Sequence, residues 1–202
     1  MIDAQGPTHP LQWTHPRLLI QSSFDPVMAS LVARYGYLRW KTRPPFPALT
    51  RSIIAQQIST KAANTIRQRL SKRVGLSPDV IAASSLPILR SVGLSRAKAM
   101  CMRQVARWAM GGELRDLRLL SDEDVISRLT RIKGVGRWTA EMFLIFSLGR
   151  LDVWPITDAG LRAAARKFYG VRSNTALVKL GSRFRPLRST AARYLWKALE
   201  ND

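Results

Sequence analysis

The sequence predicts an all-α protein. Apolar residues recur at three- and four-residue spacing along most of the chain, and no segment shows a convincing alternation of period two, which would mark a half-buried strand. Helix-capping residues precede several of these segments, and glycine follows several, as at helix ends. With 202 residues, 46% of them hydrophobic, the chain is long enough to bury a core as one compact domain.

The expected elements follow in chain order. Residues 1–24 contain His9 and His15 among several prolines and predict a loosely ordered arm, followed by a helical domain over 25–202. Asp25-Pro26 matches a helix N-cap followed by a first-turn proline, and Gly36 ends that helix. Apolar stripes predict further helices around 49–54, 62–74, 97–109, 125–132, 140–148, 161–168 and 191–199. The proline-rich segment 43–47 predicts a turn between two lobes.

A Gly-x-Gly hairpin, spanning 132–138, joins two of these helices. Ser121 begins a capping pattern before the first helix, and the second continues to Gly149. Glycines at 134 and 136 let backbone amides approach a phosphate, and the dipole of the following helix favours the same anion. Such a dipeptide pattern also fits an ordinary turn. The strand that a dinucleotide-binding fingerprint requires is missing.

The charge indicates a polyanionic partner. The chain has 33 Lys and Arg against 13 Asp and Glu, a formal net charge of +20, and residues 26–78 contain no acidic residue. Nucleic acid is the natural partner, although a ribosomal or nucleoid protein would share this composition. No apolar run approaches the length of a bilayer span, and no secretory leader is evident. We therefore expect an intracellular protein, cytoplasmic or nucleoid-associated, that acts on DNA.

Cysteine and histidine usage argues against a metal or disulfide framework. A single cysteine, Cys101, excludes an internal disulfide and a four-cysteine iron–sulfur cluster within the chain, and its apolar neighbours predict a buried structural thiol. Side chains at metal-ligand spacing are absent from the sequence. We expect no cofactor, although the carbonyl groups of the hairpin could bind a monovalent cation.

Asp158 is isolated among cations. It is the one acidic residue between Asp152 and Glu200, a stretch that contains ten Lys or Arg. Apolar residues follow it at helical spacing, so it is expected at a helix N-cap or in a first turn. An ordinary capping aspartate and a catalytic carboxylate both fit this position.

Four segments in order carry a family resemblance, at 51–59, 92–99, 132–140 and 152–158. Over roughly residues 25–200 the chain resembles the helix-hairpin-helix DNA glycosylase superfamily, and within it the 3-methyladenine DNA glycosylase II group. The resemblance implies two helical lobes, with the active site in the cleft between them. It makes Asp158 the catalytic aspartate. It assigns the contact with the DNA backbone to the hairpin residues Lys133, Gly134, Val135, Gly136, Arg137 and Thr139.

The implied chemistry needs a base turned out of the duplex and a side chain that fills the gap. By resemblance the gap-filling position falls at Gln57, with Gln56 beside it; helix-terminal capping is the alternative for both. As the N-glycosidic bond breaks, C1′ of the sugar becomes positively charged, and the carboxylate of Asp158 would stabilise that charge and orient water.

Trp138 indicates the type of reaction. It occupies the position where family members that also cut the backbone carry a Schiff-base lysine, so a monofunctional glycosylase is expected. By resemblance Trp138 lines the base pocket with Met142, Ala159 and Leu187, the last three at positions where some relatives have aromatic rings. Reduced stacking surface favours cationic alkylpurines over neutral lesions. The expected partner is double-stranded DNA with damaged bases, bound by a monomer.

Two other functions remain open at this point. A non-catalytic helix-hairpin-helix DNA-binding module would have the same charge and hairpin, with Asp158 serving as a cap. A glycosylase-lyase would share the hairpin and the aspartate, but Trp138 argues against it.

Overall fold

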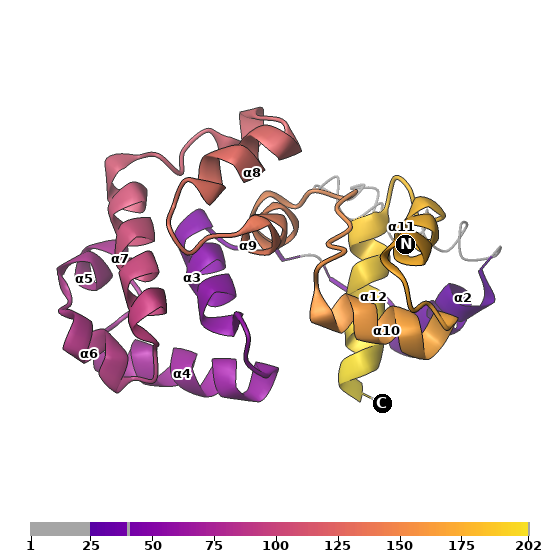
Figure 1. Cartoon of the computed structure of the whole chain (residues 1–202), viewed down its shortest axis with the longest axis horizontal. Coiled ribbons are helices and arrows are strands. Elements are labelled where there is room, and N and C mark those ends of the chain that lie inside the picture. The colour runs from indigo at the N-terminus through magenta and orange to yellow at the C-terminus, as the bar shows by residue number, and fades with distance from the viewer. Residues whose placement is uncertain (1–24, 40, 202) are drawn as a thin grey trace, which may run out of the picture. The chain divides into compact units, whose positions relative to one another are not determined.

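The computed structural model describes residues 25–39 and 41–201, and in this part of the chain every regular element is a helix (Figure 1). The predicted fold class is therefore confirmed. The predicted arm at 1–24, with both histidines, lies outside the described residues. The chain divides into two compact units, which we call the terminal unit (Met1–Lys41 and Gly149–Asp202) and the hairpin unit (Thr42–Leu148).

The terminal unit is built from both ends of the chain. Its helices are α2 (Pro26–Tyr35), α10 (Ala159–Tyr169), α11 (Asn174–Ser182) and α12 (Arg188–Asn201), and α12 packs against both α2 and α10. The predicted cap of α2 is present, because the Asp25 carboxylate accepts a hydrogen bond from Met28 N at 2.9 Å. The other Asp25 oxygen pairs with Arg183 at 2.7 Å, so a residue before α2 binds one just after α11.

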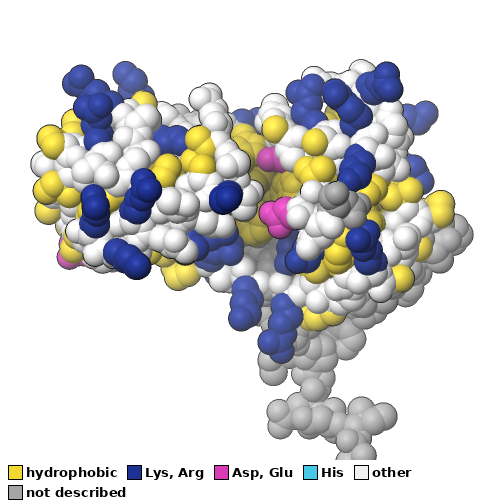
Figure 2. Space-filling model, turned by 90° about the horizontal axis from the view of Figure 1, so that it is seen from below, with side chains coloured by type: hydrophobic (Ala, Val, Ile, Leu, Met, Phe, Trp, Pro, Cys, Tyr) yellow, Lys and Arg dark blue, Asp and Glu magenta, His cyan; other side chains and the backbone are white. Residues whose placement is uncertain are grey.

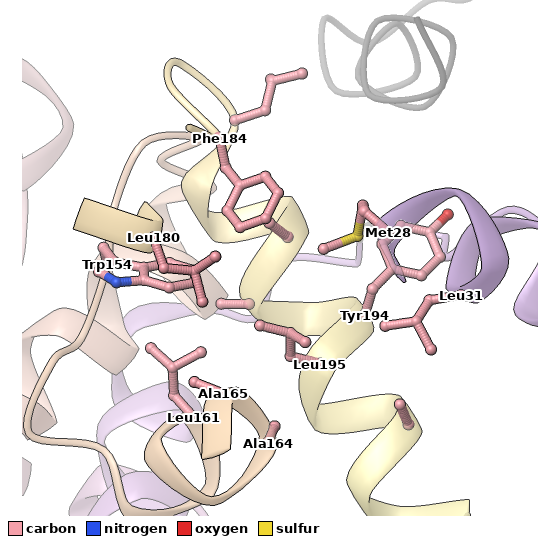
Figure 3. Close-up of a cluster of buried hydrophobic side chains, with 14 of the residues drawn as sticks. Met28, Leu31, Trp154, Leu161, Ala164, Ala165, Leu180, Phe184, Tyr194 and Leu195 are labelled. Atoms are coloured by element: carbon pink, nitrogen blue, oxygen red, sulfur yellow. The ribbon is translucent and has the colours of Figure 1, made fainter. Parts of the chain in front are cut away.

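Apolar side chains from all four helices meet in one core (Figure 3). Tyr194 and Leu195 of α12 lie among residues from α2, α10 and α11 in this close-up. Full burial of each large apolar side chain stabilises a fold by about 1.5–3 kcal/mol. The core therefore packs α2 together with α10, α11 and α12, although the whole hairpin unit separates α2 from these three helices in the sequence. Its labelled members are Met28, Leu31, Trp154, Leu161, Ala164, Ala165, Leu180, Phe184, Tyr194 and Leu195.

The hairpin unit contains the middle of the chain. Its helices are α3 (Pro45–Ala55), α4 (Thr60–Arg73), α5 (Pro78–Ala83), α6 (Leu86–Ser91), α7 (Arg96–Gly111), the 3₁₀ turn η2 (Leu117–Leu119), α8 (Asp122–Thr130), α9 (Arg137–Phe143) and the π-helical turn η3 (Leu144–Leu148). Helix α3 packs against both α7 and α9 (Figure 1). Ile53 of α3 and Val105 of α7 are both fully buried.

The proline-rich segment is a helix start rather than a turn. Pro45 and Pro47 lie in the first turn of α3, where the N–H group that proline lacks has no intrahelical acceptor. The predicted turn at 43–47 is wrong in this respect. The boundary between the two units falls slightly earlier, between Lys41 and Thr42.

Candidate functional site

The predicted hairpin joins α8 to α9. Ser121 caps α8 by accepting a hydrogen bond from Asp124 N at 3.2 Å, as the sequence predicts. After α8 the chain turns through residues 131–136, and Val135 N donates to Ile132 O at 2.9 Å within the turn. Gly136 is the N-cap of α9 and supplies no side chain to cap it. Two helices of one unit are thus linked by a tight turn that ends at an uncapped helix start.

The two hairpin glycines have different roles, which the sequence pattern does not distinguish. Gly134 has φ +96°, and a Cβ atom there would lie 3.0 Å from the Cβ atom of Cys101 on α7. The fold therefore requires glycine at 134. Gly136 has φ −94°, and a Cβ atom there would meet nothing within 4 Å. Folding places no such demand on position 136, so the absence of a side chain there leaves open surface beside the helix start.

Three of the predicted backbone-contacting residues differ in what they expose. Lys133 is exposed, as expected for a residue that meets a phosphate. The side chains of Val135 and Thr139 are buried, and the Thr139 hydroxyl, 1% exposed as a residue, accepts a hydrogen bond from Gln56 Nε2 at 2.9 Å. Both of these side chains pack inward, so neither is available for a side-chain contact with DNA.

Arg137 is held by acidic residues of both hairpin helices. Its guanidinium donates to Glu123 of α8 at 2.6 and 3.0 Å and to Glu141 of α9 at 3.2 Å. The hydrogen bond to Glu123 raises the pKa of Arg137, and the same contact lowers the pKa of the Glu123 carboxyl. A residue predicted to bind phosphate therefore already has carboxylate partners in the protein alone.

The structure distinguishes Gln56 from Gln57, which by sequence are both candidates for the gap-filling role. Gln56 is the C-cap of α3, and its side chain donates to Gly134 O at 3.0 Å as well as to Thr139. Gln57 is exposed and has φ +56°, a left-handed conformation that is uncommon outside glycine. Gln56 is thus tied to the hairpin, whereas Gln57 is presented to solvent.

Trp138 and Met142 both lie on α9, about one helical turn apart. Trp138 is half-buried and is not among the buried hydrophobic residues of the described chain. Met142 is buried. Because Trp138 is half-buried, part of its indole surface is accessible to solvent.

In the terminal unit, Asp158 is the N-cap of α10. Its Oδ1 atom accepts hydrogen bonds from Leu161 N at 2.6 Å and from the indole Nε1 of Trp196 at 2.8 Å, and the residue is 9% exposed. The capping role predicted for Asp158 is confirmed. Two donors on one oxygen also fix the orientation of the carboxylate. The indole donor comes from α12, in a residue that the sequence identifies only as part of an apolar stripe.

Gly160 makes this arrangement compatible with α10. A Cβ atom at position 160 would lie 3.2 Å from Asp158 Oδ1 and 3.2 Å from Trp196 Cδ1. The two predicted pocket residues that belong to this unit have different environments. Ala159 is exposed, whereas Leu187 is 3% exposed and belongs to the hydrophobic core. Leu187 thus packs inside the unit, because it precedes α12 where that helix meets the core.

Comparison with known proteins identifies the family. Residues 50–183 match the model of the HhH-GPD superfamily base excision DNA repair proteins. The chain belongs to the HhH-GPD superfamily. The matched range contains Gln56, the hairpin and Asp158, and ends before Leu187.

Individual known proteins match along most of the chain. The alkylbase DNA glycosidase-like protein mag2 of Schizosaccharomyces pombe is 32% identical, covering 87% of this chain and 89% of its own. DNA-3-methyladenine glycosylase 1 of the same organism is 34% identical, covering 84% and 79%. The solved structure of Schizosaccharomyces pombe 3-methyladenine DNA glycosylase (Mag1) in complex with abasic DNA has TM-score 0.82 and 33% identity, covering 91% of this chain and 97% of that one.

Two further features of this HhH-GPD chain concern metals and membranes. Cys101 is buried, as predicted, and burial raises the pKa of its thiol to about 11, so it behaves as a structural residue. In the described residues, His, Cys, Asp and Glu form no group of three or more that could hold a metal ion. None of the helices in the described part of the chain combines the length and the apolar composition needed to cross a bilayer.

Proposed function

We propose that this protein is a DNA glycosylase of the 3-methyladenine type, which hydrolyses the N-glycosidic bond of alkylated bases in double-stranded DNA during base excision repair. The observation that carries the proposal is the family match over residues 50–183, together with a relative named DNA-3-methyladenine glycosylase 1 that is 34% identical over 84% of the chain. The protein acts as a monomer and without a cofactor. Sedimentation of the free protein would test the first point.

Asp158 is the proposed catalytic residue. Loss of the base leaves positive charge on C1′ of the sugar, and a carboxylate nearby stabilises that charge as the bond lengthens. The two hydrogen bonds to Oδ1 support this role, because they hold the carboxylate in one orientation before substrate arrives. Positioning of this kind reduces the reorganisation that the reaction requires. Asp158 also orients the attacking water.

A cap alone is the competing explanation for Asp158. Serine, threonine and asparagine cap helices about as well as aspartate, so capping does not require a carboxylate. Nor does capping require an indole donor from another helix, or the glycine at 160 that gives the indole room. These two features favour the catalytic role over a non-catalytic DNA-binding module.

Binding of DNA is assigned to the hairpin and to the turn after α3. Open surface at Gly136 and the uncapped start of α9 support a close approach of a phosphate to the main chain, and Lys133 adds a positive charge. Figure 2 shows Lys and Arg side chains spread over the visible face and few Asp and Glu. Gln57, exposed in its left-handed turn, fills the gap that the flipped base leaves.

Trp138 provides a surface for stacking the flipped base. An indole face attracts an electron-poor alkylated purine through stacking and cation–π interaction. Met142, one helical turn along α9, is not aromatic and adds little to this surface. We therefore propose that cationic 3-methyl and 7-methyl purines, which depart readily, are released efficiently and that neutral lesions are released poorly.

Release of free base from damaged duplex tests the proposal. The protein is incubated with duplex containing 3-methyladenine, 7-methylguanine or hypoxanthine, and the free bases are separated by chromatography under single-turnover conditions. We expect release of both methylpurines, slower release of hypoxanthine, and none from undamaged duplex. A protein that binds all four duplexes and releases nothing would be a DNA-binding module. Equal rates for 3-methyladenine and hypoxanthine would contradict the proposed lesion range.

A second experiment tests for lyase activity. Because Trp138 stands where a Schiff-base lysine would be, borohydride added during turnover should trap no covalent complex between protein and DNA. The strand should break only after alkali or heat. A trapped adduct would show that another amine attacks the sugar.

A further inference from the structure

Lys98 binds the end of a helix that it does not belong to. It lies in the first turn of α7, and its ammonium donates hydrogen bonds to Ile54 O at 2.8 Å and to Gln56 O at 2.7 Å, at the C-terminal end of α3. The last carbonyl groups of a helix lack intrahelical donors and carry the negative end of its dipole. Helix α3 has no basic residue in its own last turn. The cation at this helix end is therefore supplied by α7.

One of these two bonds reaches the peptide group that leads into Gln57. The carbonyl of Gln56 is bonded covalently to the nitrogen of Gln57. The hydrogen bond from Lys98 therefore fixes the orientation of the peptide group that precedes Gln57, the residue in the left-handed conformation. A left-handed conformation outside glycine is unfavourable and persists where the surroundings enforce it, often at functional sites. Lys98 is half-buried, and burial lowers its pKa, so the two carbonyl acceptors offset a desolvation cost.

The side chain of Gln56 continues the connection to the hairpin. A glutamine amide nitrogen has two hydrogens, and Gln56 Nε2 has two acceptors, Gly134 O at 3.0 Å and Thr139 Oγ1 at 2.9 Å. With both donors engaged, Gln56 is occupied in the hairpin unit. Gln57 has the neighbouring position and an exposed side chain.

We propose that Lys98 and Gln56 are positioning residues, which connect α7, the end of α3 and the hairpin so that Gln57 is held ready to enter the duplex. This proposal rests on the proposed function, because it assigns gap filling to Gln57. It predicts that breaking the connection slows the flipping of the damaged nucleotide. Binding to intact duplex should change little, since the hairpin turn keeps its own hydrogen bond from Val135 N to Ile132 O.

The test replaces Lys98 and compares it with a lysine of equal charge elsewhere. Lys98→Met and the control Lys179→Met each remove one positive charge, and Lys179 is an exposed residue of α11. Two readouts are used: fluorescence of 2-aminopurine beside an abasic-site analogue in duplex, which reports unstacking, and single-turnover release of 7-methylguanine. For Lys98→Met we expect both the flipping rate and the release rate to fall about tenfold relative to Lys179→Met, because two hydrogen bonds from a charged donor are lost. Affinity for undamaged duplex should stay within about twofold of that control.

A second variant separates positioning from loss of fold. Gln56→Met removes both donors of the amide while keeping the length of the side chain, and it should slow flipping by a similar factor. If the two residues act as one connection, the double variant should be about as slow as the slower single variant. Independent, multiplying effects would overturn the connection, and so would a Lys98→Met protein that flips DNA as fast as Lys179→Met. Because the fluorescence arm needs no base release, it tests this proposal even if the wild-type protein releases no base.

Discussion

At the scale of single residues, Asp158 combines a structural and a proposed chemical role in one side chain. Asp158→Asn retains an oxygen that can accept from Leu161 N and from Trp196 Nε1, and asparagine is as good an N-cap as aspartate. We expect the melting temperature to change little and base release to fall by orders of magnitude, because the amide cannot stabilise the charge on the sugar. DNA binding should be unchanged or tighter, since a negative charge is removed.

The control for this variant is Asp79→Asn, which removes one exposed carboxylate in the first turn of α5. Chromatographic release of 7-methylguanine, anisotropy with labelled duplex and thermal melting are measured for both proteins. Excision by the Asp158 variant within a few-fold of the Asp79 variant would return Asp158 to a capping role alone.

The two hairpin glycines give a second prediction at this scale. Gly134→Val places a β-branched residue at φ +96° against Cys101, so it should lower the melting temperature. Gly136→Val meets open space, so it should leave the melting temperature nearly unchanged and weaken binding to duplex. Melting curves and anisotropy distinguish the two effects. Normal DNA binding by Gly136→Val would mean that the hairpin is only a turn.

Sequence could locate these residues but not all of their partners. The isolation of Asp158 among cations and its position before a helical stripe are visible in the chain. Its indole donor is not, because Trp196 reaches it through the packing of α12 on α10, across 38 positions of sequence. In the same way, adjacent glutamines look alike in sequence, and only the backbone angles tell Gln57 from Gln56.

At the scale of elements, helices with strong caps were predictable and short helices were not. Asp25 and Ser121 each accept a hydrogen bond from the first turn that follows, as their positions predict. The six-residue helices α5 and α6 are too short for an apolar stripe to repeat clearly, and tertiary packing stabilises them. Helix α11 was also not predicted. The start of α3 was missed because proline marks turns and first helical turns alike.

The contact between the hairpin helices gives a third prediction. Arg137 bridges Glu123 of α8 and Glu141 of α9, and a phosphate near the hairpin would compete with the more exposed Glu123. Glu123→Gln should therefore tighten duplex binding. The gain should be modest, up to about fivefold at low salt, because ion pairs at exposed positions are worth roughly 1 kcal/mol or less. The control is Glu113→Gln, which removes the same charge from an exposed carboxylate near the end of α7, and equal affinities for the two variants would exclude competition at Arg137.

At the scale of the whole molecule, the chain order and the charge have separate consequences. The terminal unit combines α2, near the start of the described chain, with α10 to α12 at its end. Its core can therefore form only after the hairpin unit, which lies between them in the sequence, has been synthesised. No shift in composition marks this arrangement in the sequence, because both units are helical and basic. It depends on contacts between residues more than a hundred positions apart, such as the hydrogen bond from Tyr194 to Gly36 O.

The formal charge of +20 predicts how binding responds to salt. Each phosphate neutralised releases counterions, so the logarithm of the affinity for undamaged duplex should fall with the logarithm of salt concentration at a slope of about −0.9 per phosphate contacted. Anisotropy titrations from about 50 to 200 mM salt would give this slope. For Gly136→Val the slope should become shallower by about one phosphate contact, because the change is confined to the hairpin. For the parent protein, the rate of base release at saturating protein should depend little on salt. A slope near zero, or one that is identical in the variant despite weaker binding, would show that the affinity does not arise from phosphate contacts at the hairpin.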